Sequence, residues 1–310
     1  MSGYAPSSPT VLVGIVVAAV FALALGYVLQ AARPTRAMRL AGWVFALVAV
    51  GGCHFALVGE AAGLRMVALV VLLLHAMKAV TAQHVRANGM RRMTLREWLA
   101  FAVMWTGMEP RDFTGRASER TPWLASACGF AFLGACAYGI ASVAWRAGHA
   151  RTAGLLLVCA GILVLHFGIV PCVAAWLRHR GFATQAQFRA PWRSSSLREF
   201  WARRWNVGYS VMMAHAIQRP IAARFGRGPA VVAVFVASGL FHEVAISLPV
   251  GDGFGLPTSY FALHGLAMVL ERGRTPGRLW AFCWVVLPAP LLFHLPFLQG
   301  VVLPTIEWAS

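Results

Sequence analysis

The sequence is short of charged residues, and above all of acidic ones. Charged side chains make up 12% of its 310 residues, whereas soluble domains carry about 25%. Asp and Glu together number 10, against 27 Lys and Arg, and Lys78 is the single lysine. Because 59% of the residues are hydrophobic, so little charge predicts an integral membrane protein with lipid as its solvent.

Several motifs are also missing, and each absence excludes a class of protein. The six cysteines form no CxxC pair and lie in or beside apolar segments, so we expect small buried side chains instead of disulfides or zinc ligands. The motif HExxH does not occur, because Ile246 stands four residues after His242. The motif GxSxG does not occur either. This argues against a metalloprotease or serine-elbow site, and we expect no metal and no bound cofactor.

Eight apolar segments approach the roughly 20 residues that a membrane-spanning helix needs. No soluble-looking block separates them, so we expect one domain over residues 1–310. The first ten residues carry no positive charge, which favours a retained first span over a cleaved signal peptide. Two shorter apolar segments, Glu97–Met108 and Val207–Ile217, suit interfacial or re-entrant helices. The eight predicted spans are Val11–Gln30, Leu40–Val58, Met66–Ala82, Pro122–Trp145, Ala153–Leu177, Pro229–Leu248, Thr258–Glu271 and Leu279–Leu298.

The basic residues follow the order of these spans. If the N-terminus lies outside, the loops at 31–39, 83–121, 178–228 and 272–278 face the cytosol and hold 23 of the 27 basic residues. Such asymmetry satisfies the positive-inside rule. It favours membrane lipids and anionic substrates as partners over nucleic acid. The arginine- and alanine-rich composition suggests a bacterial inner membrane.

Six of the ten histidines fall within predicted spans, where ionisable residues are costly and face a cavity or a partner. His242 is the most informative of them. It lies 13 residues into its span, about 20 Å along a helix, and therefore deep in a hydrocarbon layer of about 30 Å. Small residues on its face, Ser238 among them, would let a substrate approach closely. Neutral imidazole suits general-base work near pH 7. The six are His54, His75, His166, His242, His264 and His294.

A second group of residues combines two tryptophans with arginines in the basic loop at 178–228. Taken alone, this composition is typical of an amphipathic interfacial helix. Arg203 and Arg204 could equally bind phosphate groups. The Asn206 amide could donate a hydrogen bond to a thioester carbonyl, or to the oxyanion that it becomes.

At these residues the sequence resembles the wax synthase branch of the membrane-bound O-acyltransferases. The block Phe200-Trp201-Ala202-Arg203-Arg204-Trp205-Asn206 is similar to FWxRRWN, and Ser238-Gly239-Leu240-Phe241-His242-Glu243 is similar to SGLxHE. The similar region runs over residues 193–272. The tract that begins at Trp105 and ends at Pro110 also resembles this family.

The resemblance implies an all-α transmembrane helical bundle enclosing a tunnel, with His242 as the catalytic residue and Asn206 as its polar partner. Substrate would contact Trp201, Trp205, Arg203, Arg204 and Ser238. Acyl-CoA would enter from the cytosol as co-substrate, and a lipid-like alcohol would enter from the membrane side. A long-chain alcohol would give a wax-type ester.

Other functions fit parts of the same pattern. A sterol, glyceride, glycan or natural product is an alternative acceptor for the acyl group. A transporter or channel could use the intramembrane histidines as a proton relay, and Lys78 is the clearest charge for that purpose. A haem or quinone protein could use facing histidines as ligands. The oligomeric state is not predicted.

Overall fold

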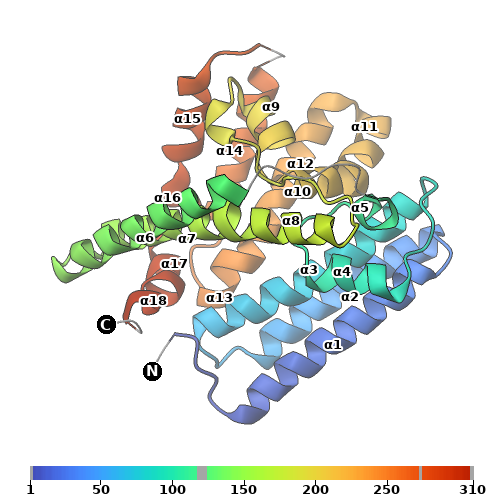
Figure 1. The fold of residues 1–310 in the computed structure, drawn as a ribbon, viewed down its shortest axis with the longest axis horizontal. Helices are drawn as coiled ribbons and strands as arrows, with labels where there is room; N and C mark the ends of the chain where they lie inside the picture. Colours follow the sequence, from blue (N-terminus) through green and yellow to red (C-terminus); the bar gives the residue numbers. More distant parts are fainter. Residues whose placement is uncertain (1–2, 117–123, 272–273, 308–310) are drawn as a thin grey trace.

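The computed structural model describes residues 3–116, 124–271 and 274–307 of the chain. Across these residues every regular element is a helix, which confirms the predicted all-α class (Figure 1). The start of the fourth predicted span, at Pro122, falls outside the described residues.

Six helical segments of the described chain are long and apolar enough to cross a membrane. They correspond in order to the first six predicted spans, so the protein is an integral, multi-pass membrane protein. The first four segments are α1 (Pro9–Ala31), α2 (Arg36–Ala56), α3 (Ala62–Arg86) and Ser126–Arg146 within α6 (Leu124–Arg146). The fifth, Ala150–His179, consists of α7 (Ala150–Gly161), the π-helix η1 (Ile162–Ile169) and α8 (Val170–His179). The sixth, Arg227–Val250, consists of α12 (Arg227–His242), the π-helix η5 (Glu243–Ser247) and α13 (Leu248–Val250).

The last two predicted spans differ from that pattern. The seventh is α14 (Leu256–Leu270), whose 15 residues reach only about 22 Å. The eighth is not the continuous helix that we expected. It consists of Arg278–Leu292 and Leu295–Ile306, bent by 69°. Prolines at 288, 290 and 296 remove backbone donors and disfavour a straight helix.

The bent span is built from α15 (Arg278–Val286), α16 (Ala289–Leu292), α17 (Leu295–Phe297), the π-helix η6 (Leu298–Val302) and α18 (Pro304–Glu307). The two short apolar segments are helical as predicted, but only in part. The first forms α4 (Leu95–Val103) and leaves the helix at Met104. The second forms α10 (Val207–Met213) and the π-helix η4 (Ala214–Gln218), which continue into α11 (Arg219–Phe225).

Helices α1, α2 and α3 lie side by side as one layer (Figure 1). The outer helices turn large apolar side chains outward, such as Leu47 and Phe55, which are 74% and 78% exposed. Helix α3 is buried instead, and small residues such as Ala76 and Ala79 let its neighbours approach. Lipid would cover the outer faces, since a soluble protein rarely exposes so much apolar surface.

Lys78 is fully buried within this layer. Its ammonium donates to the carbonyls of Phe101, Trp105 and Gly107 at 2.6, 2.8 and 3.0 Å. An ammonium has three hydrogens, so all its donors are used. The lysine therefore fastens α4 and the chain that follows it onto α3, which weakens its candidacy as a transport residue.

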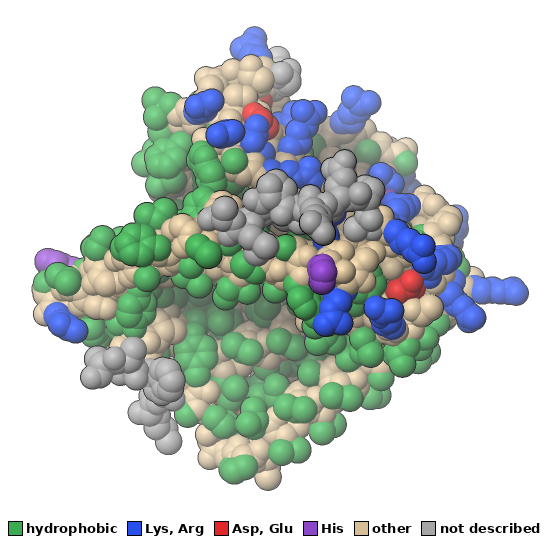
Figure 2. Space-filling model, in the orientation of Figure 1, with side chains coloured by type: hydrophobic (Ala, Val, Ile, Leu, Met, Phe, Trp, Pro, Cys, Tyr) green, Lys and Arg blue, Asp and Glu red, His purple; other side chains and the backbone are tan. Residues whose placement is uncertain are grey.

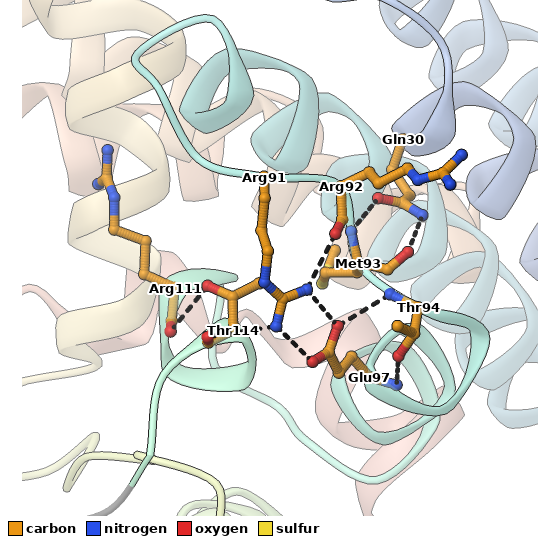
Figure 3. Close-up of polar contacts among 8 residues, drawn as sticks. All are labelled: Gln30, Arg91, Arg92, Met93, Thr94, Glu97, Arg111 and Thr114. Carbon is orange, nitrogen blue, oxygen red and sulfur yellow. Dashed lines mark hydrogen bonds and ion pairs between the residues drawn. The ribbon is translucent and has the colours of Figure 1, made fainter.

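Polar contacts fix the beginning of α4 against α1 (Figure 3). The Thr94 hydroxyl accepts from the Glu97 backbone N–H, and Glu97 accepts from the Thr94 N–H, which makes a capping box. Arg91 pairs with the same carboxylate at 2.6 Å. The Gln30 side chain of α1 exchanges two 3.1 Å hydrogen bonds with the Met93 backbone. Loop, capping box and α1 thus form one connected unit.

Basic side chains gather along the upper and right-hand parts of the face seen in Figure 2, while apolar side chains cover most of the rest. This concentration of basic side chains agrees with the prediction that most basic residues lie in loops on one side of the membrane. It also separates a lipid-facing surface from a surface suited to water and headgroups.

Candidate active site

A cavity of about 970 Å³ lies between α12, α14, the bent last span, the end of α7 with η1, and the segment 191–218. Its volume is at the upper end of the range for small-molecule sites. Most of its lining residues are aromatic or aliphatic. Part of the lining comes from π-helical turns, including those that carry His166 and Trp201, and such turns are frequent at functional sites.

The predicted residues His242, Asn206, Trp201, Trp205 and Ser238 all line this cavity. They come from two separate parts of the chain, the segment around η3 (Phe200–Arg204) and helix α12. The structure therefore brings together the polar groups of both sequence blocks around one apolar space.

His242 stands on the last turn of α12, where the helix widens into η5. Its Nδ1 lies 2.7 Å from the Ser238 carbonyl. A carbonyl can only accept, so this contact assigns the proton of a neutral ring to Nδ1 and leaves the lone pair on Nε2. The Phe261 ring, with its centroid 4.2 Å away, packs against the imidazole. A half-buried imidazole fixed in this way has the form of a general base.

Glu243 points away from its neighbour and does not pair with it. Its Oε1 accepts from the backbone N–H groups of Gly255 and Thr258, both at 3.0 Å, and from the Thr258 hydroxyl at 2.7 Å. The carboxylate thus caps the N-terminus of α14. The two adjacent residues therefore differ in role, since His242 faces the cavity and Glu243 joins two helices that form its wall.

Asn206 caps α10 with a left-handed backbone, φ 44°. Its Oδ1 accepts from the Tyr209 N–H at 3.3 Å, so its Nδ2 donors remain for the cavity. Gln187 supports this strained position, because its carbonyl accepts from the Val207 N–H at 2.9 Å and its side chain accepts from the Gly208 N–H at 2.8 Å. A Cβ on Gly208 would stand 2.4 Å from that side chain, so only glycine fits there.

Aromatic side chains surround these polar groups. Trp205 stacks on Phe200 at 5.5 Å between centroids and on His166 at 5.7 Å. Trp201 contacts Phe261 and His264 at 5.6 and 5.5 Å. The Ser238 hydroxyl donates to the Val234 carbonyl at 2.9 Å. That hydroxyl hydrogen is therefore engaged, in keeping with a cavity-wall residue and not with a nucleophile.

The predicted phosphate ligands Arg203 and Arg204 do not line the cavity. Arg204 pairs with Glu199 at 2.6 Å and donates to the Arg189 carbonyl at 3.0 Å. Hydrogen bonds from the Ser195 backbone and hydroxyl, and then from Arg204, lower the pKa of Glu199 to about 2. Arg203 is exposed.

A smaller hollow of about 400 Å³ carries a different set of arginines, Arg198, Arg219 and Arg227. It shares Gln218 and Met268 with the main cavity, so the two spaces adjoin. No acidic residue lines it in the part of the chain that the structure describes. Sequence reasoning noted the basic loop that contains these residues but did not single them out, since they are far apart along it.

Of the six histidines predicted to lie within spans, only His242 and His166 line the cavity. The others are engaged in packing. His75 and His264 contact the carbonyls of Val71 and Tyr260 at 2.7 Å, and His294 accepts from the Phe297 N–H at 3.3 Å. His166 belongs to no sequence block, so its place in the cavity could not be read from a motif.

Fold and site together define a multi-pass helical membrane protein with a histidine-bearing apolar cavity. Residues 184–263, which include both sequence blocks, match the model of the Membrane bound O-acyl transferase family. The predicted resemblance to this family is thereby confirmed over these residues.

Named relatives are similar over part of the chain. A probable long-chain-alcohol O-fatty-acyltransferase 6 of Arabidopsis thaliana is 32% identical over 98 residues, which are 29% of this chain and 28% of that protein. The long-chain-alcohol O-fatty-acyltransferase of Simmondsia chinensis is 30% identical over 100 residues, 29% of this chain and 28% of its own. Diacylglycerol O-acyltransferase 1 of Dictyostelium discoideum is 31% identical over 132 residues, 41% of this chain and 21% of its own. The matched segments span less than a third of each of these relatives.

Proposed function

We propose that the protein is a membrane-embedded O-acyltransferase that moves a fatty acyl group from acyl-CoA to a lipid-like alcohol, with His242 as general base. The observation that carries the proposal is the orientation of His242, whose Nδ1 contacts the Ser238 carbonyl and whose Nε2 is left for a substrate proton. The names of the plant relatives support a long-chain alcohol as acceptor.

In the proposed reaction, Nε2 of His242 accepts the proton of the acceptor hydroxyl as its oxygen attacks the thioester carbonyl. The C–S bond then breaks, CoA leaves as a thiolate, and the imidazolium returns its proton to the sulfur. Transfer is direct, with no acyl-enzyme, because the Ser238 hydroxyl is already engaged. The apolar lining excludes water, which protects the thioester from hydrolysis.

The donor would lie across both hollows. We assign its phosphates to Arg198, Arg219 and Arg227, since guanidinium groups suit phosphate, and its acyl chain to the main cavity. Acyl-CoA is a cytosolic metabolite, so this assignment places the basic face in the cytosol and the N-terminus outside. In a bacterium the membrane would be the inner membrane.

The test measures thiol release from palmitoyl-CoA by purified protein, with a panel of long-chain alcohols, sterols and glycerides. We expect acceptor-dependent release that His242→Gln reduces by about 10²–10⁴-fold, the usual contribution of a general base. His75→Gln is the matched control, because His75 makes the same type of contact with the Val71 carbonyl and does not line the cavity. The productive acceptor names the substrate class.

Two results would overturn the proposal. One is thiol release at the wild-type rate by the His242 variant, which would show that His242 is not the general base. The other is an absence of acceptor-dependent release from folded wild-type protein with palmitoyl-CoA and shorter donors.

A further inference from the structure

Lys78, the single lysine of the chain, carries a fully buried charge that the proposed reaction does not use. None of the acidic residues that the structure describes pairs with its ammonium. The ammonium lies instead 4.0 Å from the centre of the Phe101 ring and binds three carbonyls. A buried charge without an acidic partner is costly, and an apolar residue often serves stability as well. Stability alone is therefore a weak reason for a lysine at this position.

The three carbonyls belong to the end of α4 and to the turn that follows it. Helix α4 ends at Val103, so the Phe101 carbonyl is one of the last four, which find no partner within a helix. The carbonyls of Trp105 and Gly107 lie beyond the helix. Because one ammonium binds all three, it holds the end of α4 and the turn after it in one conformation.

This turn packs directly against the support of Asn206. A Cβ added to Gly107 would stand 2.8 Å from the Gln187 side chain, and one added to Gly208 would stand 3.0 Å from the Gly107 Cα. The two glycine backbones therefore touch. Gln187 in turn accepts, through its backbone carbonyl and its side chain, from the N–H groups of the two residues directly after Asn206. An unbroken series of contacts thus runs from Lys78 to Asn206.

Asn206 is a part of the site that needs such support. Its backbone lies in the left-handed region, at φ 44°, which residues other than glycine adopt rarely. In the proposed reaction its amide must also meet the thioester carbonyl, and a displacement of about 1 Å can lower a rate by about 10²-fold. A relaxed turn after α4 would allow Gln187 to move, and Asn206 would move with it.

Resting on the proposed acyl transfer, we propose that Lys78 is a positioning residue for Asn206. The lysine lines neither hollow, so it acts on the reaction only through other residues. It holds the turn after α4, this turn holds Gln187, and Gln187 holds the backbone that carries the Asn206 amide. The tract that begins at Trp105, which the two sequence blocks left without a role, thereby becomes part of the support of the site.

The first test compares Lys78→Met with wild type in the palmitoyl-CoA assay. We expect kcat to fall by about 10–100-fold, with KM for palmitoyl-CoA changed less than about twofold. Gln30→Met is the matched control and should keep kcat. Gln30 is equally buried and binds Met93 before the other end of α4, and neither residue lines the cavity. An unchanged kcat in Lys78→Met overturns the inference while acyl transfer itself stands.

A double-mutant cycle separates positioning from a general loss of structure. If Lys78 acts through Asn206, adding Lys78→Met to Asn206→Asp should lower kcat by less than about a further twofold, because the amide that it positions is already gone. If the lysine only stabilises the fold, its replacement should lower kcat by the same factor in both backgrounds. That second result contradicts the inference.

Gly107→Ala tests the same connection with Lys78 in place, should Lys78→Met fail to fold. The added methyl would stand 2.8 Å from the Gln187 side chain, so this side chain must shift. We expect a similar fall in kcat, again absent in the Asn206→Asp background, whereas wild-type kcat in Gly107→Ala contradicts the inference. Gly14→Ala is the control, since a Cβ there meets no atom within 4 Å. An absence of acceptor-dependent release from wild-type protein would instead overturn the proposed function.

Discussion

At the scale of single residues, the site depends on how hydrogen bonds divide the atoms of each polar group. His242 commits Nδ1 to the Ser238 carbonyl and presents Nε2. Asn206 commits its oxygen to the Tyr209 N–H and presents its nitrogen. Each side chain therefore has one atom that fixes its orientation and one atom left for substrate, which is the usual design of a preorganised site.

Asn206→Asp separates these two functions. Aspartate keeps the oxygen that caps α10 and loses the amide donor, so we expect the thermal unfolding midpoint to stay within a few degrees and kcat to fall by about 10²–10³-fold. Steady-state kinetics with palmitoyl-CoA would measure this. Asn88→Asp provides a control, because Asn88 is exposed and bonds the His84 carbonyl. Wild-type kcat in the Asn206 variant would show that the amide nitrogen is not a donor to the reaction.

The residues whose place in the cavity could be predicted are those marked by local spacing. His242 stands on a helix at calculable depth, and Asn206 closes a recognisable block. Arg203 and Arg204 stand in the same block as Asn206, yet a single turn directs them away from the cavity.

At the scale of elements, the sequence predicted helices well wherever apolar runs are long and uninterrupted. Helices α1, α2 and α3 follow their runs within a few residues. The bend in the last predicted span was not predicted, because hydropathy records composition and not the effect of prolines on the backbone near His294. The segment 183–187, which supports Asn206, could not be predicted from the sequence either. It is held by α5 (Arg111–Thr114) through contacts between residues that are distant in sequence.

Asp112 of α5 offers a test of that support. Burial raises the pKa of this carboxyl to about 7, and Glu109 adds to the rise, while hydrogen bonds from Gln185 and the charge of Arg178 oppose it. The folded state therefore binds the proton more tightly than the unfolded chain. Between about pH 4 and 7 the contribution of Asp112 to the free energy of unfolding should fall as pH rises, by at most about 1.4 kcal/mol per pH unit.

The Asp112 contribution is the difference in slope between wild type and Asp112→Asn, because His215, whose pKa burial lowers to about 4, titrates in the same range with the opposite sign. Thermal unfolding in detergent, followed across this pH range for both proteins, would measure it. Glu109→Gln should weaken the slope without removing it, since Glu109 is the smaller contributor. An Asp112→Asn protein that keeps the full wild-type slope would show that Asp112 does not contribute to it.

At the scale of the whole molecule, the cavity is assembled from segments more than a hundred residues apart, including η1 and the bent last span. No local pattern could predict that assembly. The basic face has a clearer origin, because the positive-inside asymmetry of the loops already predicted a concentration of arginine on one side. Which arginines meet at the mouth of the cavity emerged only from the structure.

Replacing Arg198, Arg219 and Arg227 together by glutamine should weaken donor binding. The three side chains are exposed, and exposed charge pairs contribute about 0.2–1 kcal/mol each. We therefore expect about a tenfold rise in KM for palmitoyl-CoA, diminishing at high salt, with kcat nearly unchanged. Arg203→Gln is the control and should change KM little. Equal effects of the two variants would place the phosphates elsewhere.

The divergence of His242 and Glu243 bears on how the site could be redesigned. Glu243 fastens α14 to the helix that carries the base, so the distance between base and opposite wall is set independently of the remaining lining. The bent last span supplies much of that remainder, including Phe282, Val286 and Phe293. If the proposed acyl transfer holds, substitutions there would alter the range of alcohols that react while leaving His242 and Asn206 in place, which makes this span the natural target for a library of selectivity variants.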